Sequence, residues 1–163
     1  MVTIQHVSGK APDYSTYQPY LNKLDEFFRI CVPKAKLAVQ QTWAYEQGSQ
    51  RLESLGYTEQ AEMFADVKAA YDRAADSIGA DFIIPSGEAF QKMIASGVEK
   101  IHRDTFHASL GLGRYTLGLL WYLMLTGNNI ENNTFSDFDE EIEQDKISLA
   151  KKCATEAAAE YRK

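Results

Sequence analysis

The sequence predicts an α/β fold, a three-layer sandwich in which helices flank a short parallel sheet. Three short apolar runs suited to β-strands alternate with segments of helical periodicity. The order strand, helix, strand, helix, strand, helix is typical of parallel strands joined by right-handed crossovers. With 163 residues, 45% of them hydrophobic, the chain is long enough for one compact domain and too short for two.

The first part of the chain supplies two of the strands. Val2–Val7 is a strand-like run, and the Gly, Pro and Asp in residues 8–13 indicate a loop after it. Apolar residues at helical spacing predict an amphipathic helix over Tyr17–Ile30, which ends before Pro33. Lys36–Thr42 is the second predicted strand.

The middle of the chain continues the alternation. A polar loop around Glu46–Ser49 precedes a long helix over Glu59–Ile78, stopped by Gly79. Asp81–Pro85 is a short apolar run suited to a buried parallel strand, and helical spacing resumes over Glu88–Ile101.

Two further helices are predicted in the last third. An apolar helix covers Leu110–Thr126 and ends at Gly127, and a long amphipathic helix rich in charge and Ala covers Phe138–Tyr161. The acidic run Asp137–Glu143 is expected to begin this last helix, since negative charge is favourable at a helix N-terminus.

The predicted sheet is thin, because doubly wound domains of this size usually have about five or six strands. The outer side of the first strand would then present unpaired backbone groups. We expect another chain, a helix or further sequence to cover it. The fold is therefore expected to be incomplete at its amino end.

Composition narrows the classes of ligand and site. The formal net charge is −6 and the 17 basic residues are scattered, which argues against a nucleic-acid groove or an anionic membrane surface and favours a neutral or cationic ligand over a polyanion. The cysteines, Cys31 and Cys153, lack the spacing of a zinc site or disulfide framework and are expected to be buried reduced thiols. No metal or cofactor is predicted.

Neither a membrane span nor a secretory signal is indicated. The longest apolar run, Leu117–Leu125, is about half the length of roughly 18 residues that a spanning helix needs. The first residues show no charged segment followed by an apolar one. The sequence therefore predicts no particular cellular compartment.

The most informative stretch is Arg103–Ser109, which places Asp104 three residues before His107. Asp104 could accept a hydrogen bond from one ring nitrogen of His107, leaving the other nitrogen to take a proton from a serine hydroxyl. The spacing alone is a weak motif because it arises readily by chance. Two other histidines are expected to be structural: His6 at a strand end and His102 facing solvent.

Several blocks together resemble a known superfamily. They are similar to the carboxyl half of the SGNH (GDSL-type) hydrolases, and most similar to an uncharacterised bacterial branch described as a domain of unknown function. The blocks are Ile84–Ala89, Arg103–Ser109, Gly113–Tyr115, Trp121–Tyr122 and Leu125–Gly127, with Ile4–Ser8 and Thr42–Tyr45 as weaker ones.

This resemblance implies a flavodoxin-like three-layer α/β fold and serine esterase or lipase chemistry, in which Asp104 orients the base His107. The Gly-Asp-Ser or Gly-Asn-Ser turn of the superfamily is absent. The serine is therefore expected outside these 163 residues, and the chain alone is expected to be inactive. Where the superfamily has Gly-x-Asn, this chain has Val7-Ser8-Gly9, so Gln5 or Ser8 is a candidate oxyanion donor.

Two residues near predicted strand ends have alternative roles. Trp43 could line a substrate rim by stacking on a sugar, or could simply pack. Ser86 is expected to cap the helix that begins near Gly87 rather than to act as a nucleophile.

Two hypotheses follow. The first is an SGNH-type ester hydrolase domain whose resemblance favours O-acylated carbohydrates as substrates. The second is a catalytically inactive binding or assembly protein on the same scaffold, which forms a homodimer through its open strand edge.

Overall fold

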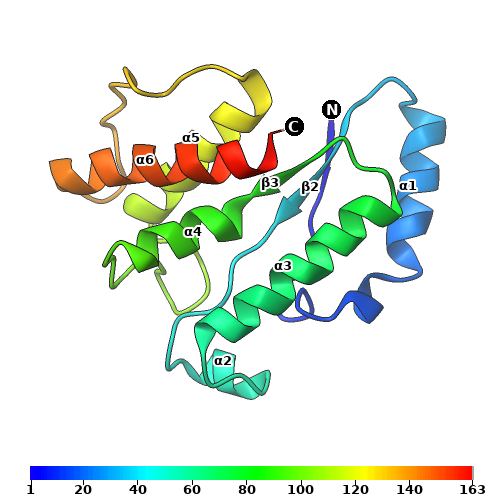
Figure 1. The fold of residues 1–163 in the computed structure, drawn as a ribbon, viewed down its shortest axis with the longest axis horizontal. Helices are drawn as coiled ribbons and strands as arrows, with labels where there is room; N and C mark the ends of the chain where they lie inside the picture. Colours follow the sequence, from blue (N-terminus) through cyan, green and yellow to red (C-terminus); the bar gives the residue numbers. More distant parts are fainter. Residues whose placement is uncertain (163) are drawn as a thin grey trace. The chain divides into compact units, whose positions relative to one another are not determined.

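The computed structural model describes residues 1–162, which form two compact units, Met1–Ile84 and residues 85–162. That the chain is a single domain stays a prediction. Each unit has its own set of packed elements, as Figure 1 shows.

The first unit contains the sheet. Its elements are β1 (Val2–Ile4), the 3₁₀ helix η1 (Tyr14–Tyr17), α1 (Tyr20–Cys31), β2 (Leu37–Gln41), α2 (Gln50–Ser54), α3 (Gln60–Ser77) and β3 (Phe82–Pro85), the last ending at the boundary with the second unit. The strand order is β1-β2-β3, and β1 runs parallel to β2 with Val2 opposite Leu37. The central strand is therefore β2.

The core of the first unit lies between β2 and α3, which runs alongside it (Figure 1). Val39 of β2 is buried, and so are Met63, Val67 and Tyr71 of α3. These helical residues recur every four positions, so they form one stripe facing the strand. Burial of each of the larger apolar side chains contributes about 1.5–3 kcal/mol.

The second unit is helical. It contains α4 (Ser86–Ala95), α5 (Leu112–Thr126) and α6 (Gln144–Tyr161), and α6 packs against both α4 and α5 (Figure 1). The buried face of α6 consists of small side chains: Ala150, Cys153, Ala154, Ala157 and Ala158. Small residues let helix axes approach closely, so one helix can pack against two neighbouring helices.

Two predicted elements extend beyond their true ends. The first strand stops at Ile4 rather than Val7. The helix predicted to run to Ile101 stops at Ala95, because Gly97 adopts a left-handed conformation with φ of 88° and the backbone of Val98 donates back to Met93. The segment after α4 is thereby released to form a loop.

The acidic run does not begin the last helix, which starts at Gln144 rather than at Phe138. Two contacts hold this run in an extended loop: Arg114 forms an ion pair with Asp139, and the Phe138 ring packs edge-to-face on Tyr115. Tertiary contacts therefore override the favourable charge at a helix start.

The predicted α/β fold class is confirmed, with a three-stranded parallel sheet and six α-helices in the part of the chain that the structure describes. The two short helical elements, η1 and α2, were not predicted. Cys153 is buried as expected, but Cys31 is exposed at the end of α1, so the prediction is wrong for this thiol. Among residues 1–162, no helix is both long and apolar enough to cross a membrane.

Candidate active site

The predicted acid–base pair lies in a tight loop of the second unit, between α4 and α5. His102 and Ala108 form an antiparallel bridge, and the Arg103 amide donates to the His107 carbonyl at 2.8 Å. Between them, Thr105 has a φ of 73°, in the left-handed region that a β-branched residue rarely adopts. Such strained positions persist only where the surroundings hold them, and they are common at functional sites.

Asp104 and His107 are in direct contact. Nδ1 of His107 lies 3.0 Å from Oδ1 and 2.9 Å from Oδ2 of Asp104, and the His107 backbone amide donates to Oδ1 at 3.0 Å. The carboxylate therefore fixes both the ring and the backbone of the same residue. Within the described residues, Nε2 of His107 makes no hydrogen bond, so it is left to accept a proton.

Arg103 is a third member of this cluster that the sequence analysis missed. Its guanidinium donates to Oδ2 of Asp104 from NH2 at 3.2 Å and from Nε at 3.4 Å. The same NH2 lies 3.3 Å from Nδ1 of His107. The Arg103 guanidinium lies closer to Asp104 than to His107, and Nδ1 of His107 also lies closer to Asp104 than to Arg103. We therefore assign the Nδ1 proton to the hydrogen bond with Asp104.

The cluster is open to solvent. The side chains of Asp104 and His107 are 43% and 51% exposed. The hydrogen bond from the His107 side chain, with smaller contributions from the His107 amide and Arg103, lowers the pKa of Asp104 well below its usual range. Asp104 is therefore an anion at any pH near neutrality, as an orienting acid must be.

His102 does not face solvent as predicted. It is 2% exposed, and its ring meets Phe90 of α4 edge-to-face at 5.8 Å. The bridge with Ala108 accounts for the difference, because it turns alternate side chains of this short hairpin toward the core and toward solvent. Burial of His102 anchors the base of the loop that carries Asp104 and His107.

The remaining candidates, Gln5, Ser8 and Trp43, belong to the first unit. Gln5 is exposed beside a small pocket of about 80 Å³, and Trp43 is half-buried just after β2. Oγ of Ser8 lies 3.2 Å from the phenolic oxygen of Tyr45. The loops after β1 and β2 therefore meet at one edge of the sheet, where ligands bind in open parallel sheets.

His6 packs rather than presenting a free base, as expected. Its ring packs at a tilt against the Tyr17 ring, with the ring centroids 4.2 Å apart, and Nε2 lies 2.9 Å from the Thr16 hydroxyl. That hydroxyl already donates to backbone carbonyls, so Nε2 carries the proton and donates to it. Burial, with a smaller contribution from Lys10, lowers the pKa of His6.

Ser86 does not cap a helix through its side chain. Helix α4 begins at Ser86 itself, after Pro85, and the buried Ser86 Oγ has no hydrogen-bond partner within the described residues. The predicted capping role is therefore wrong. Among residues 1–162, no group of three or more His, Cys, Asp or Glu side chains is arranged to hold a metal ion.

Comparison with protein families identifies the chain's relatives. The model of the domain of unknown function DUF4886 matches residues 1–157. The chain belongs to the DUF4886 family. Comparison with curated proteins gives no match.

Two solved structures resemble the chain. A DUF4886 family protein from Bacteroides uniformis is 29% identical, with a TM-score of 0.87 over 96% of this chain and 61% of its own. A protein from Slackia heliotrinireducens, provisionally described as an SGNH hydrolase, is 24% identical, with a TM-score of 0.55 over 66% of this chain and 56% of its own. The chain thus spans about three fifths of the length of the Bacteroides protein.

These neighbours agree with the predicted three-layer α/β sandwich, since they are folds of the same kind. The Slackia protein, at 24% identity, shares the fold. The roles of Asp104, His107, Gln5, Ser8 and Trp43 stay predictions.

Proposed function

We propose that this DUF4886 domain is part of an SGNH-type serine ester hydrolase, with Asp104 as the orienting acid and His107 as the general base. One observation carries the proposal. Nδ1 of His107 is held by the Asp104 carboxylate at 2.9 Å while Nε2 is left free within the described residues. A base held in one tautomer by a carboxylate is the arrangement that activates a serine hydroxyl.

The serine is proposed to lie in sequence outside these 163 residues. Nε2 of His107 removes the hydroxyl proton as the serine oxygen attacks the ester carbonyl carbon. The protonated ring then gives that proton to the alkoxide that leaves, so an alcohol departs and an acyl-serine remains. A water molecule repeats the sequence, giving the carboxylic acid and restoring the serine and neutral His107.

O-acylated carbohydrates are the proposed substrates, on the strength of the resemblance noted above. Gln5 and Ser8 are the proposed donors to the carbonyl oxygen as it becomes negative, since an oxyanion needs preplaced N–H or O–H groups. Trp43 is half-buried after β2 and is the proposed stacking surface for a sugar ring.

The first test compares two polypeptides and one variant. The 163-residue chain is expected to show negligible hydrolysis of p-nitrophenyl acetate. A longer natural product of the same gene, containing an upstream strand followed by Gly-Asp-Ser or Gly-Asn-Ser, is expected to be active. In that longer protein, His107→Ala is expected to lower kcat at least about 10²-fold, the range of a lost general base.

Two results would contradict the proposal. If the 163-residue chain were active and lost that activity with His107→Ala, a serine within the chain would be the nucleophile. Full activity of the longer protein after His107→Ala would remove His107 from the mechanism.

A catalytically inactive binding or assembly protein is the second candidate. The observation that favours it is the free outer edge of β1, the end strand of the sheet. Such an edge offers unpaired N–H and C=O groups to a second copy. A genuine start of the gene at Met1, with no upstream serine turn, would favour this alternative.

A further inference from the structure

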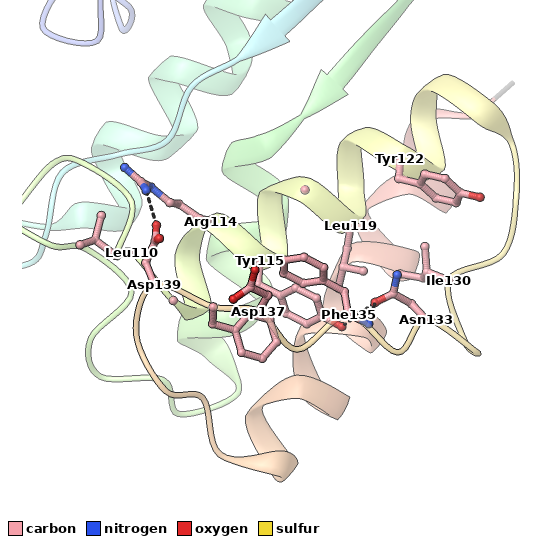
Figure 2. Close-up of a pocket in the computed structure, with 13 residues that line it drawn as sticks. Leu110, Arg114, Tyr115, Leu119, Tyr122, Ile130, Asn133, Phe135, Asp137 and Asp139 are labelled. Atoms are coloured by element: carbon pink, nitrogen blue, oxygen red, sulfur yellow. Dashed lines mark hydrogen bonds and ion pairs between the residues drawn. The ribbon is translucent and has the colours of Figure 1, made fainter.

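A pocket of the second unit lies along α5, and no role has been assigned to it above. Its volume is about 420 Å³, within the range of small-ligand sites. One wall is α5 and the other is the loop that joins α5 to α6 (Figure 2). Neither Asp104 nor His107 lines it.

The walls of the pocket are largely aromatic. Phe138 meets Tyr115 edge-to-face at 5.0 Å and meets Phe135 at 5.5 Å, so three rings form a continuous surface. Tyr122 lies further along α5 and is 46% exposed, while Phe135 is 54% exposed. Exposed rings gathered in one hollow are typical of a binding site.

The lack of a side chain at Gly118 of α5 leaves open space next to these rings. Gly118 lines the pocket, and a Cβ built at this position would meet no atom within 4 Å. Glycine in the middle of a helix costs roughly 1 kcal/mol relative to alanine. Its effect here is to leave the space between Tyr115 and Tyr122 open.

The opposite wall is fixed in place. Asp139 pairs with Arg114 at 2.6 Å, and the Gly111 amide donates to Glu140 at 3.3 Å. Nζ of Lys151 donates to the carbonyls of Glu131 and Asn133 at 2.9 and 2.7 Å. These bonds hold both ends of the loop, so the hollow is preformed.

The charge at the pocket is negative. Arg114 is the one basic side chain among the lining residues, and Asp139 neutralises it. The Asp137 carboxylate also lines the pocket and forms no ion pair within the described residues. Figure 2 shows Asp137 beside the aromatic rings rather than turned toward Arg114. One carboxylate therefore remains uncompensated next to the rings.

We propose that this pocket binds an organic cation, a small quaternary or protonated amine whose charge lies over the Tyr and Phe rings and beside Asp137. The faces of aromatic rings carry negative potential and attract cations, and a carboxylate at the rim adds to that attraction. An anionic ligand would meet the unpaired Asp137. A neutral ligand would gain apolar contact but nothing from the charge.

The test measures binding of choline and of 3,3-dimethylbutan-1-ol to the full chain, by titration calorimetry and by shifts of the aromatic proton NMR signals. The alcohol has the same shape as choline but no charge. Choline is expected to bind about 3- to 30-fold more tightly, the range of a partly desolvated cation–π contact. Methyl glucoside and acetate serve as neutral sugar and anion probes, and neither is expected to bind.

Three variants locate the site. Asp137→Asn is expected to weaken choline binding about 3- to 10-fold and to leave the alcohol unchanged. The matched control, Glu141→Gln, makes the same change in net charge on an exposed residue of the same loop that does not line the pocket, and is expected to have no effect. Gly118→Leu, which fills open space in α5, is expected to abolish binding while the helix stays folded.

Equal binding of choline and its neutral analogue would overturn the proposal, and so would tighter binding of methyl glucoside or acetate. Absence of choline binding up to about 50 mM would do the same, since it corresponds to negligible affinity. An equal loss of binding in Asp137→Asn and Glu141→Gln would show only a long-range charge effect and would also overturn the site.

Discussion

At the scale of single residues, the arrangement of the candidate site depends on what each side chain does for its neighbour. Asp104 accepts from the ring and the amide of His107, and Arg103 donates to the same carboxylate. The contact between Asp104 and His107 could be predicted because both are close along the chain. Arg103 could have been added on the same ground, as a cation beside a carboxylate, but the turn that brings it round depends on the left-handed Thr105.

Asp104 is expected to titrate well below the ordinary pKa of an aspartate, about 3.9. Because the native pKa is lowered, its contribution to stability is present above the ordinary value and is lost as the pH falls through the lowered one. The measurement is a carboxyl ¹³C NMR titration. His107→Ala is expected to move the pKa upward more than Arg103→Gln does, since the His107 side chain is the largest cause of the shift. An unchanged midpoint in His107→Ala would contradict the assigned hydrogen bond.

At the scale of elements, long periodic segments were predictable and short or tertiary-dependent ones were not. The helix predicted over Glu59–Ile78 corresponds to α3 at Gln60–Ser77, because its apolar stripe and terminal glycine are local signals. The start of α6 was missed because Arg114, far along the chain, draws Asp139 into a loop. The open pocket along α5 could not be predicted either, since it requires the position of that loop.

The start of α5 is expected to tolerate no side chain at Gly113. A Cβ there would lie 2.8 Å from the Ile101 carbonyl oxygen and 3.0 Å from Oγ of Ser109. Gly113→Ala is therefore expected to lower the free energy of unfolding by roughly 1–3 kcal/mol, as overpacking does. Urea denaturation measures the change.

Gly118→Ala is the matched control, since it lies in the same helix with nothing within 4 Å of the added Cβ. It is expected to raise the free energy of unfolding by up to about 1 kcal/mol through helix propensity. If the two variants changed the free energy of unfolding equally, the close approach of α5 to the 101–109 loop would not contribute to stability.

At the scale of the whole molecule, the first unit presents an unpaired strand edge together with an apolar helix surface. Tyr20, Phe27 and Ile30 of α1 are 68%, 57% and 80% exposed. The sequence predicted the open edge from the small number of strands. The exposure of these α1 side chains needed the structure, since helical spacing alone does not show which face of a helix is covered.

The chain is expected to self-associate as its concentration rises from about 1 μM to about 1 mM, because burial of this apolar surface is favourable. Sedimentation velocity measures the change in mass. Ile30→Glu is expected to abolish association. The control is Leu125→Glu, which adds the same charge at an exposed apolar position of α5 and is expected to leave association intact. A monomer at all concentrations would contradict the assembly alternative.

The pairing of Asp104 with His107 has one more consequence, for the order of assembly. Its partners are three residues apart, so forming it costs little loop-closure entropy. Short loops close in roughly 10–100 ns, whereas strands joined through helical crossovers must wait for distant segments. The loop that carries the proton-accepting His107 is therefore expected to close before the parallel strands pair.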